Sequence, residues 1–442
     1  MAIEDAGCGR WAGWSALAVV VCLAAAGAAP AADWPRFRGP NGTGVAADDD
    51  ATPVEFGPDK HLAWKTALPG EGVSSPIVVG DRVVVTAYSG YGAAGGTQLD
   101  LVRHVVCLDR GTGTILWSKA IEAVLPEDPY SGMGVPSHGY ASHTPVSDGR
   151  RIFAFLGKSG IHAYDLEGRL LWQRSVGTES DPRAWGSASS PIVVGDVVVV
   201  TAGPERRAIV GLDAATGEER WSAPADSLGN VWGTPAVAVV DPTRTDVVIG
   251  APGELWGLNP ATGKVRWYCP GVGDDGFNTS VVVADGVAYA VEGRSGGSMA
   301  VRVGGKGDVG ATHTVWSGRE ANRFGTPVLY RGRLYVVSGG VVSCLDAATG
   351  ERLYQSRLPG GAGGGGRRGG DYSSPVAADG KIYFVSAAGD VHVLAAGDTF
   401  TSLAVNRVGD DGESFAATPA ISAGALFIRS NRHLYCFRQE TR

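Results

Sequence analysis

The side chains with the clearest potential for chemistry stand just before a series of short apolar runs, where aromatic and polar residues alternate. The candidate binding residues of this kind are Tyr140, His143, Arg183, Trp185, Trp232, Phe277, Asn278, Arg323, Phe324, Tyr372 and Phe415. Further polar residues beside them are His138, Asn230, Asp275, Asp371 and Glu413. Large aromatic rings next to a guanidinium are typical of binding surfaces. Two interpretations stay open: the aromatic rings pack between repeated units, or they line a channel mouth that binds a ligand or peptide.

The same residues predict neither a metal centre nor a catalytic constellation. His138 and His143 are five residues apart on an expected loop, which is too little for a pair of metal ligands. The cysteines beyond residue 32 are Cys107, Cys269, Cys344 and Cys436, and no two of them are adjacent or in Cys-x-x-Cys spacing. A disulfide framework or a cysteine-rich metal site is therefore not expected. No catalytic residue is assigned.

Export is predicted from residues 1–32. Arg10 precedes the apolar run 14–26, and the small residues 27–32 offer cleavage sites. The run is short for a membrane span, so we expect a periplasmic or secreted protein rather than an anchored one. The net charge of −7 argues against nucleic acid as the partner. Residues 33–60 are expected to form an N-terminal segment, in which 48–50 is a solvated linker, and residues 61–442 the main domain.

The elements that must position the candidates repeat along the chain. The heptapeptide LDAATGE begins at Leu212 and again at Leu345, which are 133 residues (345 − 212) or about three periods of roughly 44 apart. A period of this size with several apolar runs is typical of one four-stranded propeller blade. The heptapeptide itself is interpreted as a hairpin turn, in which Gly217 and Gly350 supply positive φ. A phosphate-binding loop would need a following helix, which is not expected here.

The blades can be counted from their first residues. The starts read Ser75-Pro76, Thr144-Pro145, Ser190-Pro191, Thr234-Pro235, Thr326-Pro327, Ser374-Pro375 and Thr418-Pro419, with an eighth at Thr279-Ser280, where serine replaces proline. The last strands give a second count from Trp64, Trp117, Trp172, Trp221, Trp267 and Trp316, with Tyr354 and Leu403 as weaker equivalents. The second series begins before the first, so residues 61–68 are expected to complete the last blade. The fold class is therefore an all-β, eight-bladed β-propeller of four-stranded antiparallel blades, closed by its N-terminal strand.

Strand parity predicts that one face of the ring is elaborated. Loops between the second and third strands share a face with the connections between blades, and nearly all long segments fall there. They are 88–101, 125–140, 178–185, 294–298 and 359–370. Binding residues tend to lie on such loops. A tryptophan at one position in each blade is expected to seal neighbouring blades.

The [ST]-P starts, the L-D-A-x-T-G turn and the following tryptophan resemble the repeat of pyrroloquinoline-quinone (PQQ)-type propellers, a superfamily that includes quinoprotein dehydrogenases and BamB. Trp34 to Gly42 (WPRFRGPNG) resembles the start of a group of secreted bacterial PQQ-like propellers. The resemblance implies either a non-enzymatic scaffold that binds an envelope protein or cell-surface component, or a PQQ- and calcium-dependent dehydrogenase of alcohols or sugars. The vicinal cysteines of many quinoprotein alcohol dehydrogenases and a lipoprotein motif are missing. We therefore expect the scaffold, as a monomer, with no assured cofactor.

Overall fold

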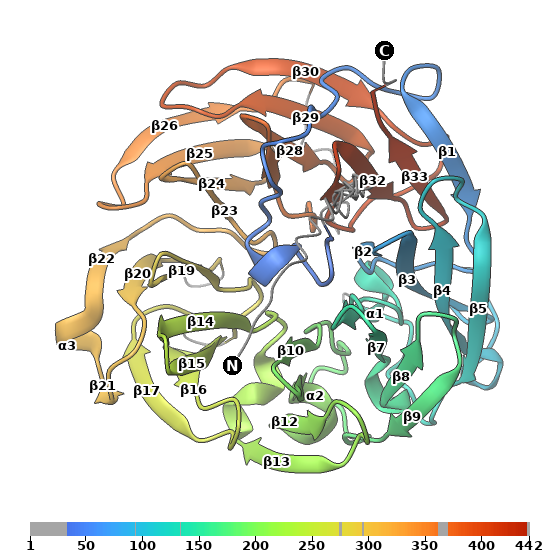
Figure 1. The fold of residues 1–442 in the computed structure, drawn as a ribbon, viewed down its shortest axis with the longest axis horizontal. Helices are drawn as coiled ribbons and strands as arrows, with labels where there is room; N and C mark the ends of the chain where they lie inside the picture. Colours follow the sequence, from blue (N-terminus) through green and yellow to red (C-terminus); the bar gives the residue numbers. More distant parts are fainter. Residues whose placement is uncertain are drawn as a thin grey trace, which may run out of the picture.

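Short Val-rich runs form the strands, because β-branched side chains favour extended backbone. The computed structural model describes residues 33–92, 94–132, 134–273, 276–293, 296–360 and 370–439. Over these residues the strands form eight sheets arranged as blades around a central channel (Figure 1). The predicted eight-bladed propeller is therefore confirmed. The expected export signal (1–32) and most of the loop 359–370 lie outside the described residues.

Each blade has four antiparallel strands, ordered from the channel outward. Blade 1 contains β2 (Ile77–Val79), β3 (Arg82–Ser89), β4 (Val102–Asp109) and β5 (Ile115–Glu122), and blade 2 contains β6 (Val146–Ser147), β7 (Arg151–Phe155), β8 (Ile161–Asp165) and β9 (Leu170–Arg174). Blade 3 contains β10 (Ile192–Val194), β11 (Val197–Ala202), β12 (Ala208–Asp213) and β13 (Glu219–Pro224), and blade 4 contains β14 (Ala236–Asp241), β15 (Arg244–Ala251), β16 (Glu254–Leu258) and β17 (Val265–Pro270).

The second half of the ring follows the same plan. Blade 5 contains β18 (Val282–Ala284), β19 (Val287–Val291), β20 (Ser298–Arg302) and β22 (Thr314–Gly318), and blade 6 contains β23 (Val328–Tyr330), β24 (Arg333–Ser338), β25 (Val341–Asp346) and β26 (Arg352–Arg357). Blade 7 contains β27 (Val376–Ala378), β28 (Lys381–Val385), β29 (Asp390–Ala395) and β30 (Ser402–Arg407), and blade 8 contains β31 (Ala420–Ser422), β32 (Ala425–Arg429), β33 (His433–Phe437) and β1 (Leu62–Ala67).

Strand β1 comes from the start of the chain and closes the ring. It pairs antiparallel with β33, from Leu62 opposite Phe437 to Ala67 opposite His433. In Figure 1 the blue β1 lies against the red β33. The pairing covers the edge that β33 would otherwise present to solvent, and such edges promote aggregation. The predicted closure by residues 61–68 is confirmed.

Helical segments are short and lie in the connections. They are the 3₁₀ helices η1 (Pro40–Gly42), η2 (Gln98–Asp100), η3 (Gly157–Ser159) and η4 (Asp226–Asn230), and the α-helices α1 (Val135–His138), α2 (Gly203–Arg206) and α3 (Gly310–His313). None of the helices in the described part of the chain has the length and apolar character needed to cross a bilayer.

The outer-strand tryptophans seal neighbouring blades. Five indole N–H groups each donate to a backbone oxygen in the turn between the third and fourth strands of the next blade: Trp64 to Arg110, Trp117 to Leu166, Trp172 to Ala214, Trp221 to Pro260 and Trp316 to Ala347. The LDAATGE turn supplies two of these acceptors. The heptapeptide is therefore repeated both because it forms a tight turn and because the turn accepts the indole hydrogen bond of the preceding blade.

One expectation about register was wrong. The last member of the tryptophan series is Ala404, which lies opposite Val393, as Trp221 lies opposite Gly211. Leu403 is the extra residue of the β-bulge between Ala404 and Ser402, and its side chain is 42% exposed. Trp267 has the predicted register, opposite Gly257, but its indole donates to Asp246 within its own blade rather than to the next blade.

The exception at Trp267 follows from an insertion in blade 5. Between β20 and β22 the short turn is replaced by a longer segment, which contains α3 and β21 (Gly307–Asp308). Strand β21 pairs parallel with β17, where Gly307 lies opposite Trp267. The indole is therefore completely buried. The sequence repeat did not reveal this insertion, which lies on the face of the short turns.

The turn glycine under each tryptophan is required for two reasons. Gly217 has φ +73°, and a Cβ atom there would lie 2.6 Å from Trp172. We expect Gly217→Ala to lower the free energy of unfolding by about 3 kcal/mol, from backbone strain together with overpacking. Gly195→Ala is the matched control, because Gly195 also has positive φ (+62°) but open space around it. It should cost about 1–2 kcal/mol in urea denaturation. Equal losses would contradict the packing role.

Candidate functional site

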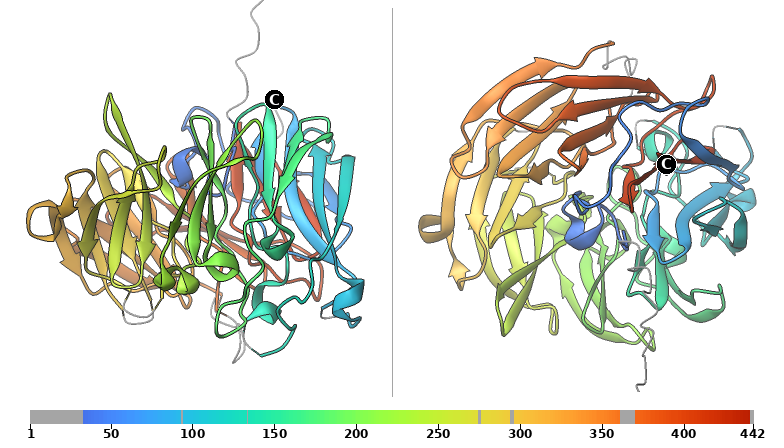
Figure 2. Two further views of the ribbon diagram at one scale, coloured as in Figure 1. Left: turned by 90° about the horizontal axis from the view of Figure 1, so that it is seen from below. Right: turned by 45° about the horizontal axis from the view of Figure 1, so that its top comes forward.

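The N-terminal segment closes one end of the channel. Trp34 pairs with Val78 of β2 through two backbone hydrogen bonds of 2.9 Å, and Ser147 N–H donates to Pro35. The guanidinium of Arg38 is fully buried and donates to the backbone oxygens of Thr326, Pro327 and Pro375. In Figure 1 this blue segment crosses the centre of the ring, and in Figure 2 (left) it lies on the side opposite α1 and α2.

The stretch 48–50, expected to be a solvated linker, is partly fixed to the propeller. The carboxylate of Asp48 accepts hydrogen bonds from the Tyr330 hydroxyl (2.5 Å), from Arg331 (2.9 Å) and from the Asp379 N–H (2.7 Å). These bonds outweigh the effect of burial and lower the pKa of Asp48. The segment therefore runs along the short-turn face, defined as the side with the turns between strands one–two and three–four.

The opposite side, the long-loop face, carries a cavity of about 490 Å³. Its floor includes Phe37 of the N-terminal segment, and its wall is formed by residues just before each inner strand. The exposed side chains of Arg183 and Arg323 belong to its lining, so the cavity opens on this face. Its volume is in the range of small-molecule and peptide pockets.

The inner wall is a closed ring of hydroxyl groups. In each blade the N–H of the starting Ser or Thr donates to the hydroxyl oxygen of the starting residue in the next blade, at 2.9–3.0 Å. The order is Ser75, Thr144, Ser190, Thr234, Ser280, Thr326, Ser374, Thr418 and back to Ser75. This hydroxyl ring corrects the eighth blade start, because Ser280 supplies the hydroxyl and Val281 takes the place of proline.

A second ring of side chains lies two residues earlier in each blade, because alternate residues of an extended chain point the same way. Its members are Val73, Ser142, Ala188, Trp232, Asn278, Phe324, Tyr372 and Ala416, and all eight line the cavity. The large side chains fall in blades 4 to 7 and the small ones in blades 8 and 1 to 3. The cavity therefore has one aromatic wall and one wall of small residues.

Trp185 reaches the cavity from the side of the small residues and is held by its neighbours. The Asp181 carboxylate accepts the N–H groups of Arg183 and Trp185, each at 2.8 Å. His138 Nε2 lies 2.8 Å from the Trp185 carbonyl oxygen, and the Trp185 and Trp232 rings are 5.8 Å apart. Burial lowers the pKa of His138. The loop that presents Trp185 is therefore preorganised.

The described cavity lining is positively charged, whereas the whole chain has a net charge of −7. Arg183 and Arg323 lie over the rings of Trp185 and Phe324, 4.9 and 5.0 Å from the ring centroids. Among the described residues neither guanidinium pairs with a carboxylate, and the described lining contains no Asp or Glu. Arginine over an aromatic ring keeps its N–H groups free for a ligand. The site therefore favours ligands with anionic or acceptor-rich groups.

The structure brings seven of the predicted residues together and places four elsewhere. The cavity is lined by Arg183, Trp185, Trp232, Asn278, Arg323, Phe324 and Tyr372. Phe277 and Phe415 are buried between blades and stand one residue before Asn278 and Ala416, the members of the second ring in their blades. For these two residues, the interpretation that the aromatic rings pack between repeated units agrees with the structure. Asp275 lies outside the described residues.

Sequence reasoning missed several lining residues. They include Phe37, Ser137, Ser142 and the eight ring hydroxyls, and His138 was named only as a polar neighbour of the candidates. Counting back in twos from each starting Ser or Thr would have found the second ring. Phe37 had no such signal, because it comes from a segment outside the repeat.

Tyr140 and His143 belong to a buried polar cluster beneath blades 1 to 3. Arg103 forms an ion pair with Glu127 and donates to the Tyr140 carbonyl oxygen, while the Tyr140 hydroxyl donates to the backbone carbonyl oxygen of Asp128 (2.7 Å). His143 Nε2 lies 2.9 Å from the Ser187 hydroxyl, which donates to Glu205 of α2. The cluster fixes the long loops rather than lining the cavity.

Glu205 makes the stability of this cluster depend on pH. Burial raises the pKa of Glu205 from 4.5 to about 7. The folded protein therefore binds this proton more tightly than the unfolded chain, and its contribution to stability is lost as pH rises from about 4.5 to 7. At 1.36 kcal/mol per pKa unit the loss is about 3 kcal/mol.

We expect Glu205→Gln to remove this decline, because the amide stays neutral. Its melting temperature should exceed that of the unmodified protein at pH 8 and match it near pH 5. Glu218→Gln, at an exposed position, is the control and should follow the unmodified protein. Parallel pH profiles for the unmodified protein and the Glu205→Gln variant would contradict the assignment.

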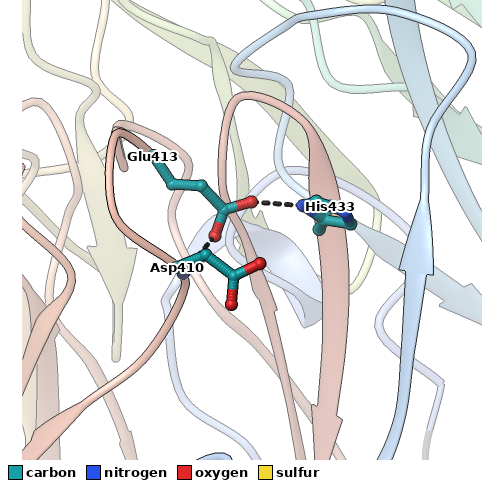
Figure 3. A group of neighbouring side chains, drawn as sticks. All are labelled: Asp410, Glu413 and His433. Atoms are coloured by element: carbon teal, nitrogen blue, oxygen red, sulfur yellow. Dashed lines mark hydrogen bonds and ion pairs between the residues drawn. The ribbon is translucent and has the colours of Figure 1, made fainter.

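Asp410, Glu413 and His433 form another polar group on the long-loop face, with potential ligand atoms within 4.8 Å of one another. Figure 3 shows Glu413 between the other two. Both carboxylate oxygens of Glu413 are already used: Oε1 accepts from His433 and Ser430, and Oε2 from Tyr435 and the Asp410 N–H. Burial raises the pKa of Glu413, but the bonds from Tyr435 and His433 outweigh it and lower the pKa. The group is a hydrogen-bonded network that ties the last two blades together.

A calcium-bound quinone is not matched by the cavity. Calcium prefers carboxylate and carbonyl oxygens, and the described lining offers the Asn278 amide and hydroxyl groups without a carboxylate. The described residues therefore do not fit this cofactor. Residues 274 and 275, both aspartates, are not among them.

Comparison with known proteins agrees with this fold. The family model described as outer membrane protein assembly factor BamB matches residues 101–294, 275–399 and 313–442. No curated protein matches the sequence. The crystal structure of BamB from Moraxella catarrhalis is similar, with a TM-score of 0.60 and 16% identity over 86% of this chain and 98% of that chain.

Quinoprotein dehydrogenases are similar to the same degree. A europium-containing methanol dehydrogenase has a TM-score of 0.67 and 13% identity over 92% of this chain and 98% of its own. The quinohemoprotein alcohol dehydrogenase from Comamonas testosteroni has a TM-score of 0.60 and 13% identity over 93% of this chain and 82% of its own. At these identities the similarity concerns the fold alone. The family match extends over most of the repeats, and the chain therefore belongs to the BamB-type family of PQQ-like β-propellers.

Proposed function

We propose that the protein is an exported, non-enzymatic propeller that binds a protein or another envelope component through its long-loop face. The description of its family, an outer membrane assembly factor, supports a role in the envelope. The predicted export signal is compatible with a periplasmic or secreted location. The observation that carries the proposal is the asymmetry of the two faces: residues 33–46 close the channel on one, while cavity and long loops share the other.

A lobe beside the cavity supports binding of a protein partner. The blade 1 lobe consists of the described residues of 89–101 and 123–140. Gln98 ties its two loops together through hydrogen bonds of 2.9 and 3.0 Å with the backbone of Glu127. Leu99 is 84% exposed, and Val124 and Leu125 are each 42% exposed. Exposed apolar side chains on an ordered lobe are typical of protein-binding surfaces.

The test is capture of a partner from an envelope extract, followed by cross-linking and mass spectrometry. The double variant Leu99→Asp/Leu125→Asp should lose the partner. Leu170→Asp/Leu403→Asp is the control, because it adds the same charges at exposed positions on the outer strands. Loss in the control alone, or capture unaffected in both, would overturn the proposal. Dye-linked oxidation of an alcohol or sugar after addition of PQQ and calcium would instead establish a dehydrogenase.

A further inference from the structure

The hydroxyl ring presents eight O–H groups to the cavity. Each of its eight side chains is at most 7% exposed, and each oxygen already accepts the N–H of the preceding blade. Among the described residues none of these hydroxyls donates a hydrogen bond. A hydroxyl can donate one bond as well as accept, and buried donors are normally satisfied. The ring is therefore suited to a group rich in acceptor oxygens.

The aromatic wall adds a second requirement. Phe324 and Tyr372 are neighbours, with ring centroids 4.3 Å apart, and Trp232 continues the wall toward Trp185. All these rings are only partly buried. The second ring lies closer to the cavity mouth than the hydroxyl ring, because its residues are two positions farther from the start of the inner strands. A ligand that places an anion on the hydroxyls would therefore lay an apolar group against the aromatic wall.

The closed floor limits how a polymer can enter. Phe37 and the buried Arg38 block the passage to the short-turn face. A polypeptide cannot thread through the channel, so it must enter from the long-loop face as a chain end or as the tip of a loop. Of these segments, the carboxyl terminus carries the acceptor oxygens that best suit the ring hydroxyls and the guanidinium groups of Arg183 and Arg323, neither of which pairs with a carboxylate in the described part of the chain. Capture of a terminal carboxylate is a known mode of peptide recognition.

We infer that the cavity receives the free carboxyl terminus of a partner polypeptide whose last residue is aromatic. The carboxylate accepts hydrogen bonds from the hydroxyl ring, and the terminal side chain packs on Trp232, Phe324 and Tyr372. Arg183 and Arg323 at the mouth attract the anionic end. This inference rests on the proposed function and names the part of the partner that enters the cavity.

The test measures binding of fluorescein-labelled peptides to the full chain by fluorescence anisotropy. The probe is a Gly-Ser peptide ending in Phe with a free carboxylate. Amidation of the terminus, a Gly-Ser-Gly extension beyond Phe, or replacement of Phe by Ser should each weaken binding roughly tenfold or more. Equal affinity of the amidated or extended peptide would overturn the inference. So would binding of phenylacetate with no binding of the peptide, because the cavity would then be a small-molecule site.

Charge variants link the peptide to this cavity. Arg183→Gln/Arg323→Gln should weaken the probe roughly tenfold and reduce its dependence on salt. Arg150→Gln/Arg302→Gln is the matched control, because both residues are exposed and lie on the short-turn face. An equal loss in both pairs would contradict the site. If no peptide binds while Leu99→Asp/Leu125→Asp still abolishes capture of the partner, only this inference fails and the proposed function stands.

Discussion

Deletion of residues 33–70 is expected to turn a cooperative melting transition into aggregation. The deletion removes β1 and exposes the edge of β33, which includes the largely buried Leu434 and Cys436. It also removes Trp64, whose indole seals blade 8 against blade 1. Unpaired strand edges associate with other chains, so light scattering during heating and size-exclusion chromatography should both report larger species.

The shorter deletion of residues 33–56 separates closure of the ring from closure of the channel. It retains β1 and should leave a monomer with a lower melting temperature, because Trp34 and Phe56 no longer pack. If the chain lacking 33–70 melts like the complete protein, pairing of β1 with β33 contributes nothing to stability. If the shorter deletion aggregates equally, the N-terminal segment and not β1 is responsible.

Arg38→Ala is expected to lower the free energy of unfolding by about 3 kcal/mol. Hydrogen bonds from a charged donor are worth about 1.5–3 kcal/mol each, and loss of the donor leaves buried carbonyl oxygens without a partner. The stabilisation that these hydrogen bonds provide is partly offset by the cost of burying the cation, which also lowers the pKa of Arg38 to about 9. Urea denaturation measures the difference.

Two further variants show whether the loss in Arg38→Ala comes from the hydrogen bonds of the guanidinium. Arg38→Lys keeps the charge but loses the planar fork that reaches Thr326, Pro327 and Pro375 together, so an intermediate loss is expected. Arg150→Ala, at an exposed position on the same face, should stay within about 0.5 kcal/mol of the unmodified protein. If Arg38→Ala also changes the free energy of unfolding by no more than about 0.5 kcal/mol, the N-terminal segment does not need the hydrogen bonds of Arg38.

The sequence by itself determined the features that repeat locally. The number of blades, the closing strand 61–68 and the sealing tryptophans could be predicted, because each blade buries the same positions against its neighbour. The face with the long loops followed from strand parity alone. Each of these depends on interactions within one blade or between adjacent blades, which a repeat in the sequence records.

Only the tertiary structure decided which side chains line the channel and which are buried between blades. A bulge moved the last sealing position from Leu403 to Ala404, since an extra residue reverses which side chain points inward. Phe324 stands two residues before its ring hydroxyl and lines the cavity, whereas Phe277 stands three residues before its own and is buried between blades. These distinctions depend on single-residue register, which composition does not specify.

The closed floor of the cavity was the least predictable feature. Arg38 reaches the backbone oxygens of Thr326 and Pro375, which are 288 and 337 residues away in the sequence. Its partners are main-chain carbonyl groups, and every residue carries one, so no side-chain pattern announces the contact. The sequence thus determined a ring with one elaborated face, because repeated neighbours specify it. The fold alone decided that the ring is a one-ended cavity, because long-range contacts of a non-repeated segment close it.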